Sequence, residues 1–137
     1  MGALLGLDLG QRRVGVALCD ERTSIATPLT RLEFKSRRHL VSEILKLVRE
    51  YQVIKIVVGL PKTLKGEMGP AAQKMTEQVA WLKSQIPVPW ELWDERLSTR
   101  EVERVLLEAD LSRARRREVR DPLAAQRILQ TYMDYHR

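Results

Sequence analysis

The sequence predicts an α/β fold in which one mixed sheet is flanked by helices. Three extended segments come first, and segments with helical spacing then alternate with two more strands. Short turns make neighbouring strands antiparallel, whereas a strand–helix–strand connection makes them parallel, so the five-stranded sheet is mixed. The chain has 137 residues, of which 44% are hydrophobic and 31% charged, which suits one packed core. We therefore expect a single domain over residues 1–137.

The first three strands form an antiparallel meander. Residues Ala3–Leu9 are an apolar run typical of a buried strand. The turn at Gly10 leads into Val14–Cys19, and a second turn leads into Ile25–Phe34. Because both turns are short, the three strands pair with their neighbours in the antiparallel sense.

Helices and strands alternate in the middle of the chain. Apolar side chains recur with helical spacing from Val41 to Val48, and the β-branched run Ile54–Val58 is typical of a strand. Pro70 suits the first position of the next helix, which ends before Pro87. A fifth strand covers Val88–Trp93.

Two more helices complete the predicted order. Ser98 stands three residues before Glu101, which is the spacing of a capping box. Asp121 is suited to cap the last helix, and Pro122 to open it. The order is therefore βββαβαβα with a C-terminal helix.

The charge and the cysteine content limit the classes of function. The net charge is +6, and residues 111–120 hold five arginines against one glutamate. Such a basic stretch favours a polyanionic partner through counterion release, although a solvated helix face would look the same. Cys19 is the single cysteine, so an internal disulfide is excluded. No apolar run is long enough for a membrane span and the N-terminus has no signal-peptide pattern, so we expect a cytoplasmic protein without a membrane partner.

Asp8 is the residue that a purely structural interpretation explains least well. It interrupts an apolar strand, and strand alternation places it on the same face as Gly6 and Gly10. A buried carboxylate is costly unless it is paired or binds a metal, and glycines beside it let a ligand approach. The alternative is that Asp8 caps the following turn or pairs with Arg12 or Arg13.

Two further carboxylates stand next to chain reversals. Glu95 and Arg96 lie just beyond the fifth strand, where α/β proteins gather ligand-binding groups. Asp121 follows the arginine-rich stretch, and helix capping is its structural alternative. Together with Asp8, these acids tolerate proximity only if divalent cations neutralise them, and oxygen ligands suit Mg²⁺ or Mn²⁺. Basic side chains nearby make metal-assisted phosphodiester hydrolysis the leading chemistry.

Four sequence blocks resemble the YqgF/RuvX family, in the order that the family has them. The blocks cover nearly the whole chain and together are specific: Gly6–Ala17, Val57–Pro61 with Gly66, Gly69 and Pro70, Asp94–Thr99, and Asp121–Gln130. The resemblance implies an RNase H-like fold and a divalent-metal nuclease. It assigns the catalytic and metal-binding role to Asp8, Glu95 and Asp121. It also implies either 5′ maturation of the 16S ribosomal RNA precursor or resolution of Holliday junctions.

Basic residues near these acids are the expected contacts to the substrate backbone. Phosphate contacts position a nucleic acid without reading its bases. The partner would be RNA or branched or single-stranded DNA, bound by a monomer or a homodimer. The predicted nucleic-acid-binding residues are Arg12, Arg13, Lys62, Lys65, Arg96, Arg113, Arg115, Arg116, Arg117 and Arg120.

Two other classes of function remain open from the sequence. A non-catalytic nucleic-acid-binding protein would have the same basic surface. A nucleotide-binding lobe is the second, because the hairpin around Asp8 also resembles the phosphate loop of sugar kinases and actin-like ATPases. Those proteins close two lobes around a nucleotide, and 137 residues supply one.

Overall fold

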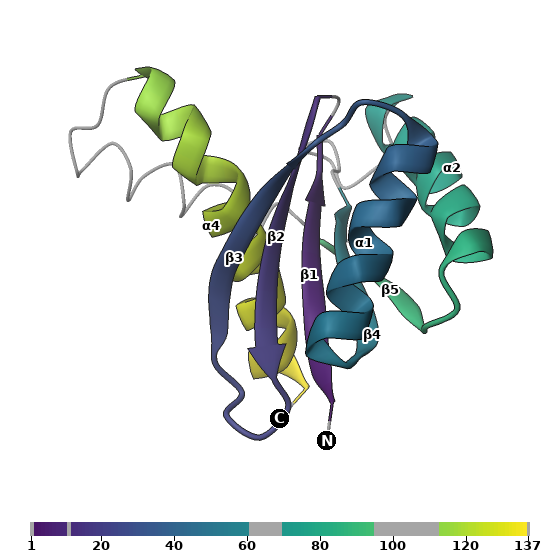
Figure 1. Cartoon of the computed structure of the whole chain (residues 1–137). Coiled ribbons are helices and arrows are strands. Elements are labelled where there is room, and N and C mark those ends of the chain that lie inside the picture. Colours follow the sequence, from purple (N-terminus) through teal and green to yellow (C-terminus); the bar gives the residue numbers. More distant parts are fainter. Residues whose placement is uncertain (1, 11, 61–69, 95–112, 137) are drawn as a thin grey trace.

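The computed structural model describes residues 2–10, 12–60, 70–94 and 113–136. The five predicted strands and three of the predicted helices are present in the predicted order (Figure 1). The helix predicted after Ser98 lies outside the described residues. The elements are β1 (Ala3–Leu9), β2 (Arg13–Asp20), β3 (Ala26–Glu33), α1 (Arg37–Tyr51), β4 (Val53–Leu60), α2 (Pro70–Gln85), β5 (Trp90–Asp94) and α4 (Arg113–Tyr135).

The strands form one mixed sheet in the order β3-β2-β1-β4-β5. β1 pairs with β2 and β2 with β3 in the antiparallel sense, whereas β1, β4 and β5 are parallel neighbours. The predicted meander followed by parallel strands is thereby confirmed. Since β1, β4 and β5 run in one direction, they end at the same edge of the sheet, which we call the carboxyl edge.

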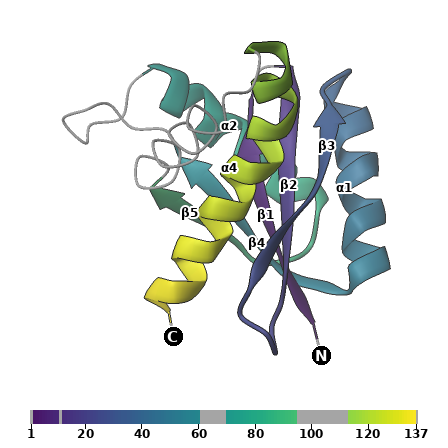
Figure 2. The same cartoon turned by 90° about the vertical axis from the view of Figure 1, so that its left-hand side faces the viewer.

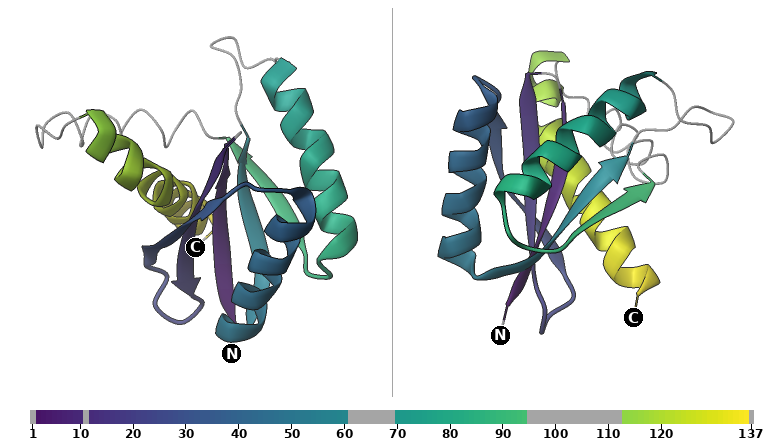
Figure 3. Two further views of the ribbon diagram at one scale, coloured as in Figure 1. Left: turned by 45° about the horizontal axis from the view of Figure 1, so that its top comes forward. Right: turned by 90° about the vertical axis from the view of Figure 1, so that its right-hand side faces the viewer.

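Helices cover both faces of the sheet, so the described part of the molecule has three layers. α1 and α2 lie on one face and α4 lies on the other (Figures 2 and 3). Each face of the sheet has its own hydrophobic core, and alternate residues of β1 pack in one or the other. Leu5 and Leu7 belong to the core with α1 and α2, and Leu4 belongs to the core with α4. Trp90 and Trp93 also divide between the two cores, as their odd separation predicts.

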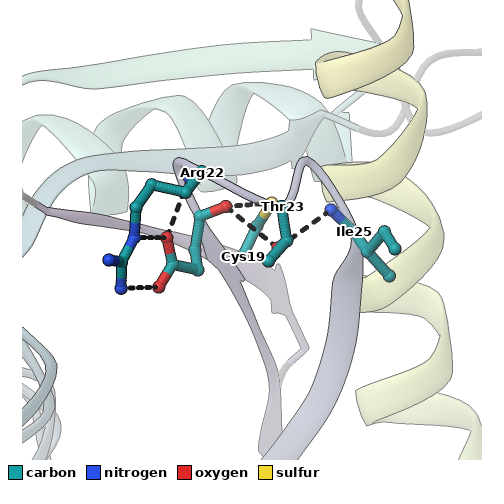
Figure 4. Close-up of polar contacts among 5 residues, drawn as sticks. Cys19, Arg22, Thr23 and Ile25 are labelled. Atoms are coloured by element: carbon teal, nitrogen blue, oxygen red, sulfur yellow. Dashed lines mark hydrogen bonds and ion pairs between the residues drawn. The ribbon is translucent and has the colours of Figure 1, made fainter.

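The turn between β2 and β3 lies at the edge opposite the carboxyl edge and is held by polar contacts (Figure 4). The backbone N–H of Arg22 donates to the Asp20 carboxylate at 2.8 Å, and the Thr23 hydroxyl donates to the Asp20 carbonyl. The Arg22 backbone N–H and guanidinium lower the pKa of Asp20. Ser24 has a φ of 58°, which closes the turn in a left-handed conformation.

The start of the last helix differs from the prediction. α4 begins at Arg113, so Asp121 and Pro122 lie inside the helix and the predicted cap at Asp121 is wrong. The reason is that arginine, alanine and glutamate are good helix formers, and they carry the helix back through the basic stretch. A proline inside a helix removes one hydrogen bond but does not prevent the helix from continuing.

Candidate active site

Asp8 stands near the end of β1 on the face that α4 covers. Strand alternation gives Leu4, Gly6 and Asp8 the same face, and Leu4 packs in the α4 core. Gly6 lies directly under α4, because a Cβ on it would be 2.9 Å from the Cβ of Leu129. Asp8, two residues nearer the carboxyl edge, is half-buried. The structure therefore places this carboxylate beside the helix that contains Asp121.

The neighbours of Asp8 on the same face of the sheet are glycines. Asp8 pairs with Gly15 on β2. On β4, the register Leu7–Val58 brings Gly59 to the level of Asp8. Along β1 itself, the preceding residue on this face is Gly6. The carboxylate therefore stands on a floor formed by backbone, which leaves space for a ligand close to the sheet.

Gly10 forms the predicted turn but does not belong to the open face beside Asp8. We expected it to share the face of Asp8 and to admit a ligand, but β1 ends at Leu9 and Gly10 forms the turn into β2. Its N–H donates to the Arg13 carbonyl at 2.9 Å, and a Cβ at this position would be 2.7 Å from the same oxygen. The absence of a side chain therefore permits a tight turn. Gly15 and Gly59, which sequence spacing alone does not bring to Asp8, take the place that we assigned to Gly10.

The end of β5 lies two strands from Asp8 at the carboxyl edge. Gly59 pairs with Trp93, so Trp93 is at the level of Asp8 across β4. Trp93 packs on the α4 side, which is also the face of Asp8. The strand ends at Asp94, immediately before Glu95. Glu95 itself lies outside the described residues.

Helix α4 runs towards the carboxyl edge in its first half. A Cβ on Gly6 would be 3.0 Å from the Ala125 carbonyl oxygen, so α4 crosses β1 there. Further along the helix, Gln130 accepts from the N–H of Ala26, at the opposite edge of the sheet. α4 is therefore antiparallel to β1, and Asp121 is about one helical turn nearer the carboxyl edge than Ala125. The side chains before Pro122 in this helix lie outside the description.

Polar and aromatic contacts fix the second half of α4 on the sheet. Lys55 of β4 donates to the Tyr132 hydroxyl, and its ammonium lies 5.1 Å from the centroid of that ring. The hydrogen bond to Tyr132, with attraction from Glu91 at 3.6 Å, raises the pKa of Lys55. Trp93 donates to Thr131 at 3.0 Å and meets the Tyr132 ring edge to face. These contacts position the helix from which Asp121 comes.

The predicted basic residues fall into three groups. Arg12 is exposed and Arg13 half-buried, and both lie at the turn that follows β1 at the carboxyl edge. Lys62, Lys65 and Arg96 lie outside the described residues. The others are in the first half of α4, where the structure gives the helix but not the side chains: Arg113, Arg115, Arg116, Arg117 and Arg120.

Within the described residues, no three His, Cys, Asp or Glu side chains gather as ligands for a metal ion. Of the three predicted ligands, only Asp8 has a described side chain. In the same part of the chain, no helix has the length and apolarity to cross a membrane.

Comparison with known proteins places the chain in a family. The sequence model of the RuvX family, described as Holliday junction resolvase, matches residues 2–135. The chain belongs to the RuvX family. RuvX relatives called "Putative pre-16S rRNA nuclease" include one from Thermoanaerobacter pseudethanolicus, 46% identical over 96% of this chain and 95% of the relative. Another, from Desulforudis audaxviator, is 47% identical over 96% of this chain and 93% of its own. The predicted family and nuclease class are confirmed.

Solved structures similar to this RuvX chain share its fold. Thermus thermophilus RuvC in complex with a Holliday junction substrate has a TM-score of 0.61 at 12% identity, covering 100% of this chain and 96% of that one. The fowlpox virus resolvase, solved with Holliday junction DNA, has a TM-score of 0.59 at 9% identity and covers 98% of both chains. The predicted RNase H-like fold is confirmed by this likeness.

Proposed function

We propose that residues 1–137 form one cytoplasmic nuclease domain that hydrolyses phosphodiester bonds with a divalent metal ion, in the 5′-end maturation of the 16S ribosomal RNA precursor. The names of relatives at 46% and 47% identity support this substrate. The observation that carries the proposal is the position of Asp8. This half-buried carboxylate stands on a floor of glycine backbone at the edge where β5 ends. The first half of α4 runs to the same edge.

A divalent ion at this edge would be held by three acidic residues. Asp8, Glu95 and Asp121 would supply carboxylate oxygens, which are the ligands that Mg²⁺ and Mn²⁺ prefer. Gly15 and Gly59 leave the sheet bare beside Asp8, so no side chain on these strands obstructs an ion or a phosphate. When bound, such an ion lowers the pKa of a coordinated water and neutralises negative charge that develops on phosphate oxygens.

The other residues of the site hold the substrate. The guanidiniums of Arg12 and Arg13 follow β1 directly and would bind phosphates flanking the scissile bond. The basic first half of α4, together with Lys62, Lys65 and Arg96, would extend these contacts along the strand. Since such contacts go to phosphates, they position the substrate without selecting its sequence.

The direct experiment is cleavage of a 5′-extended 16S precursor fragment by purified protein with Mg²⁺, Mn²⁺ or EDTA. We expect Asp8→Asn to lower the cleavage rate about 1,000-fold or more, because it removes a ligand of an ion that contributes several kcal/mol to the transition state. Circular dichroism and RNA affinity should stay close to wild type. Asp134→Asn, near the other end of α4, is the matched control, since Asn can still accept from Gln130. Wild-type cleavage by the Asp8→Asn variant would refute the proposed site.

Holliday junction resolution is the second candidate function, and the description of the matching family favours it. The same protein should be offered four-way DNA junctions beside single-stranded and duplex RNA. Paired symmetrical nicks confined to junctions would identify a resolvase, which needs two sites related by symmetry and thus a homodimer. Directional shortening of RNA would identify the maturation nuclease. Binding without cleavage under any metal would leave a non-catalytic nucleic-acid-binding protein.

A further inference from the structure

A group of cations lies at the carboxyl edge, in which Arg12 and Arg13 are joined by four residues that the sequence analysis did not single out. We call the basic residues of segments 12–13 and 31–38 the rim cluster. The two segments hold six basic residues and one acidic residue, Glu33. Most members are exposed and the remaining two are half-buried. The members are Arg12, Arg13, Arg31, Lys35, Arg37 and Arg38.

The fold brings these two segments together. Arg13 at the start of β2 pairs with Glu33 at the end of β3, so both strands reach the edge side by side. The N–H of Phe34 then donates to the Arg12 carbonyl at 2.8 Å. Ser36 caps α1, which therefore begins beside the turn that follows Asp8 (Figure 1). The rim cluster and Asp8 thus lie at one edge, although the residues are far apart in sequence.

Two charges of the rim cluster, on Lys35 and Arg38, gain little from the local electrostatics of the fold, whereas Arg31 forms an ion pair with Glu33 at 3.6 Å. The N-terminal end of a helix carries partial positive charge, which favours acidic side chains there. α1 instead begins with Arg37 and Arg38 and has no acidic residue in its first turn. Arg37 lies 5.4 Å from the centroid of the Trp81 ring. Among the described residues, no acidic side chain forms an ion pair with Lys35 or Arg38. The fold therefore gains little from these two cations.

Binding of an anionic partner would account for exposed cations that have no acidic partner in the described part of the chain. We propose that the rim cluster binds the sugar–phosphate backbone of a base-paired segment of the substrate, next to the strand held at Asp8. The inference rests on the proposed nuclease function. The rings nearest the cluster are not open for stacking, because Phe34 packs against the core and Arg37 covers Trp81. Proteins that bind unpaired strands add stacking on exposed aromatic rings to their phosphate contacts, whereas a duplex can be held by phosphate contacts alone.

The test is the salt dependence of RNA binding, measured in EDTA so that no cleavage occurs. The variant Lys35→Ala/Arg38→Ala should bind a short RNA duplex more weakly. A plot of log affinity against log salt has a negative slope, and its magnitude should decrease by about 0.9 per cation removed, the value for duplex DNA. The control Lys46→Ala/Arg49→Ala removes the same charge from the far end of the same helix and should keep the wild-type slope. The unfolding midpoint of the Lys35/Arg38 variant should equal or exceed that of wild type.

The possible results separate this inference from the proposed function. A duplex slope equal to that of the control variant would overturn it, as would a lower unfolding midpoint in the Lys35/Arg38 variant. An equal loss of affinity for single-stranded RNA would overturn the assignment to a base-paired segment. If Asp8→Asn cleaved normally, the proposed function would fail, but the slope measurement would be unaffected because it needs no cleavage.

Discussion

Asp8 places a half-buried carboxylate near the end of β1, on the face of the sheet that α4 covers. The other residues on that face of β1, Leu4 and Gly6, are covered by α4. Half-burying a carboxylate is costly unless other groups or a cation stabilise its charge. The glycines beside it on β2 and β4 leave the sheet bare at this point. This arrangement leaves room for a ligand beside the carboxylate.

Gly6 sets how closely α4 approaches the sheet. A Cβ on Gly6 would be 2.9 Å from the Cβ of Leu129 and 3.0 Å from the Ala125 carbonyl oxygen, so the whole helix would have to shift. We predict that Gly6→Ala lowers the free energy of unfolding by about 1–3 kcal/mol, as overpacking does. Chemical denaturation measures this loss. The cleavage rate should fall too, because α4 also contains Asp121.

Gly2→Ala is the matched control for that substitution. A Cβ on Gly2 would also meet a neighbour, but the nearest atoms belong to the side chain of Ile54. Ile54 is 46% exposed and Gly2 precedes β1, so this contact can be relieved towards solvent, and the nearest backbone atom, the Gln52 carbonyl oxygen, would be 3.1 Å away. The loss of stability should therefore be clearly smaller than for Gly6→Ala. Equal losses would show that contact with α4 is not what excludes a side chain from Gly6.

At the scale of elements, the start of α4 is the feature that the sequence predicts wrongly. Asp121 and Pro122 have the residue types of a helix start, yet the helix begins at Arg113. In the helix interior, Pro122 cannot donate to the carbonyl of Glu118, four residues earlier. Local signals at a proline do not distinguish a helix start from a tolerated interior proline. The packing of the rest of α4 on the sheet decides between them.

Replacing the proline tests the position of the helix start. If Pro122 is interior, Pro122→Ala restores a hydrogen bond and should raise the free energy of unfolding by about 1–3 kcal/mol. Pro70→Ala is the control, because Pro70 opens α2, where its missing N–H costs nothing. Thermal unfolding of both variants measures the difference. If Pro122→Ala were no more stable than Pro70→Ala, the helix would instead begin at Asp121, as the sequence predicts.

The strands were more predictable than the site. The bounds of β1 and the opposite faces of Trp90 and Trp93 follow from apolar runs and alternation, which are local properties. The glycines beside Asp8 were not predictable, because strand register brings Gly15 and Gly59 to it. Register depends on how whole strands pair and cannot be counted along one strand.

The other four members of the rim cluster were missed for a related reason. Arg12 and Arg13 were expected to bind nucleic acid because they follow Asp8 directly. Lys35 and Arg38 lie more than twenty residues later and read as an ordinary basic loop and helix start. They lie near Asp8 because β2 begins and β3 ends at the carboxyl edge, where the two strands of the hairpin are side by side. A cluster of cations from distant parts of the sequence can be recognised only once the pairing of the strands is known.

At the scale of the whole molecule, the elements that carry the candidate site residues meet at the carboxyl edge of the sheet. β1 and β5 end there, α1 and α2 begin there, and the first half of α4 runs towards it (Figure 3). The β2–β3 turn lies at the opposite edge, where Asp20 and Arg22 form an ion pair with each other. Groups that bind and cut a ligand are typically found at the carboxyl ends of parallel strands. We therefore predict that a divalent ion binds at this edge.

Titration calorimetry with Mn²⁺ tests that site most directly. Wild-type protein should bind the ion, and Asp8→Asn, Glu95→Gln and Asp121→Asn should each weaken binding by about tenfold or more, equivalent to about 1.4 kcal/mol. Asp134→Asn should bind Mn²⁺ as wild type does. We predict that ion binding needs all three acidic residues and does not need Asp134. Wild-type affinity in any one of the three variants would contradict it.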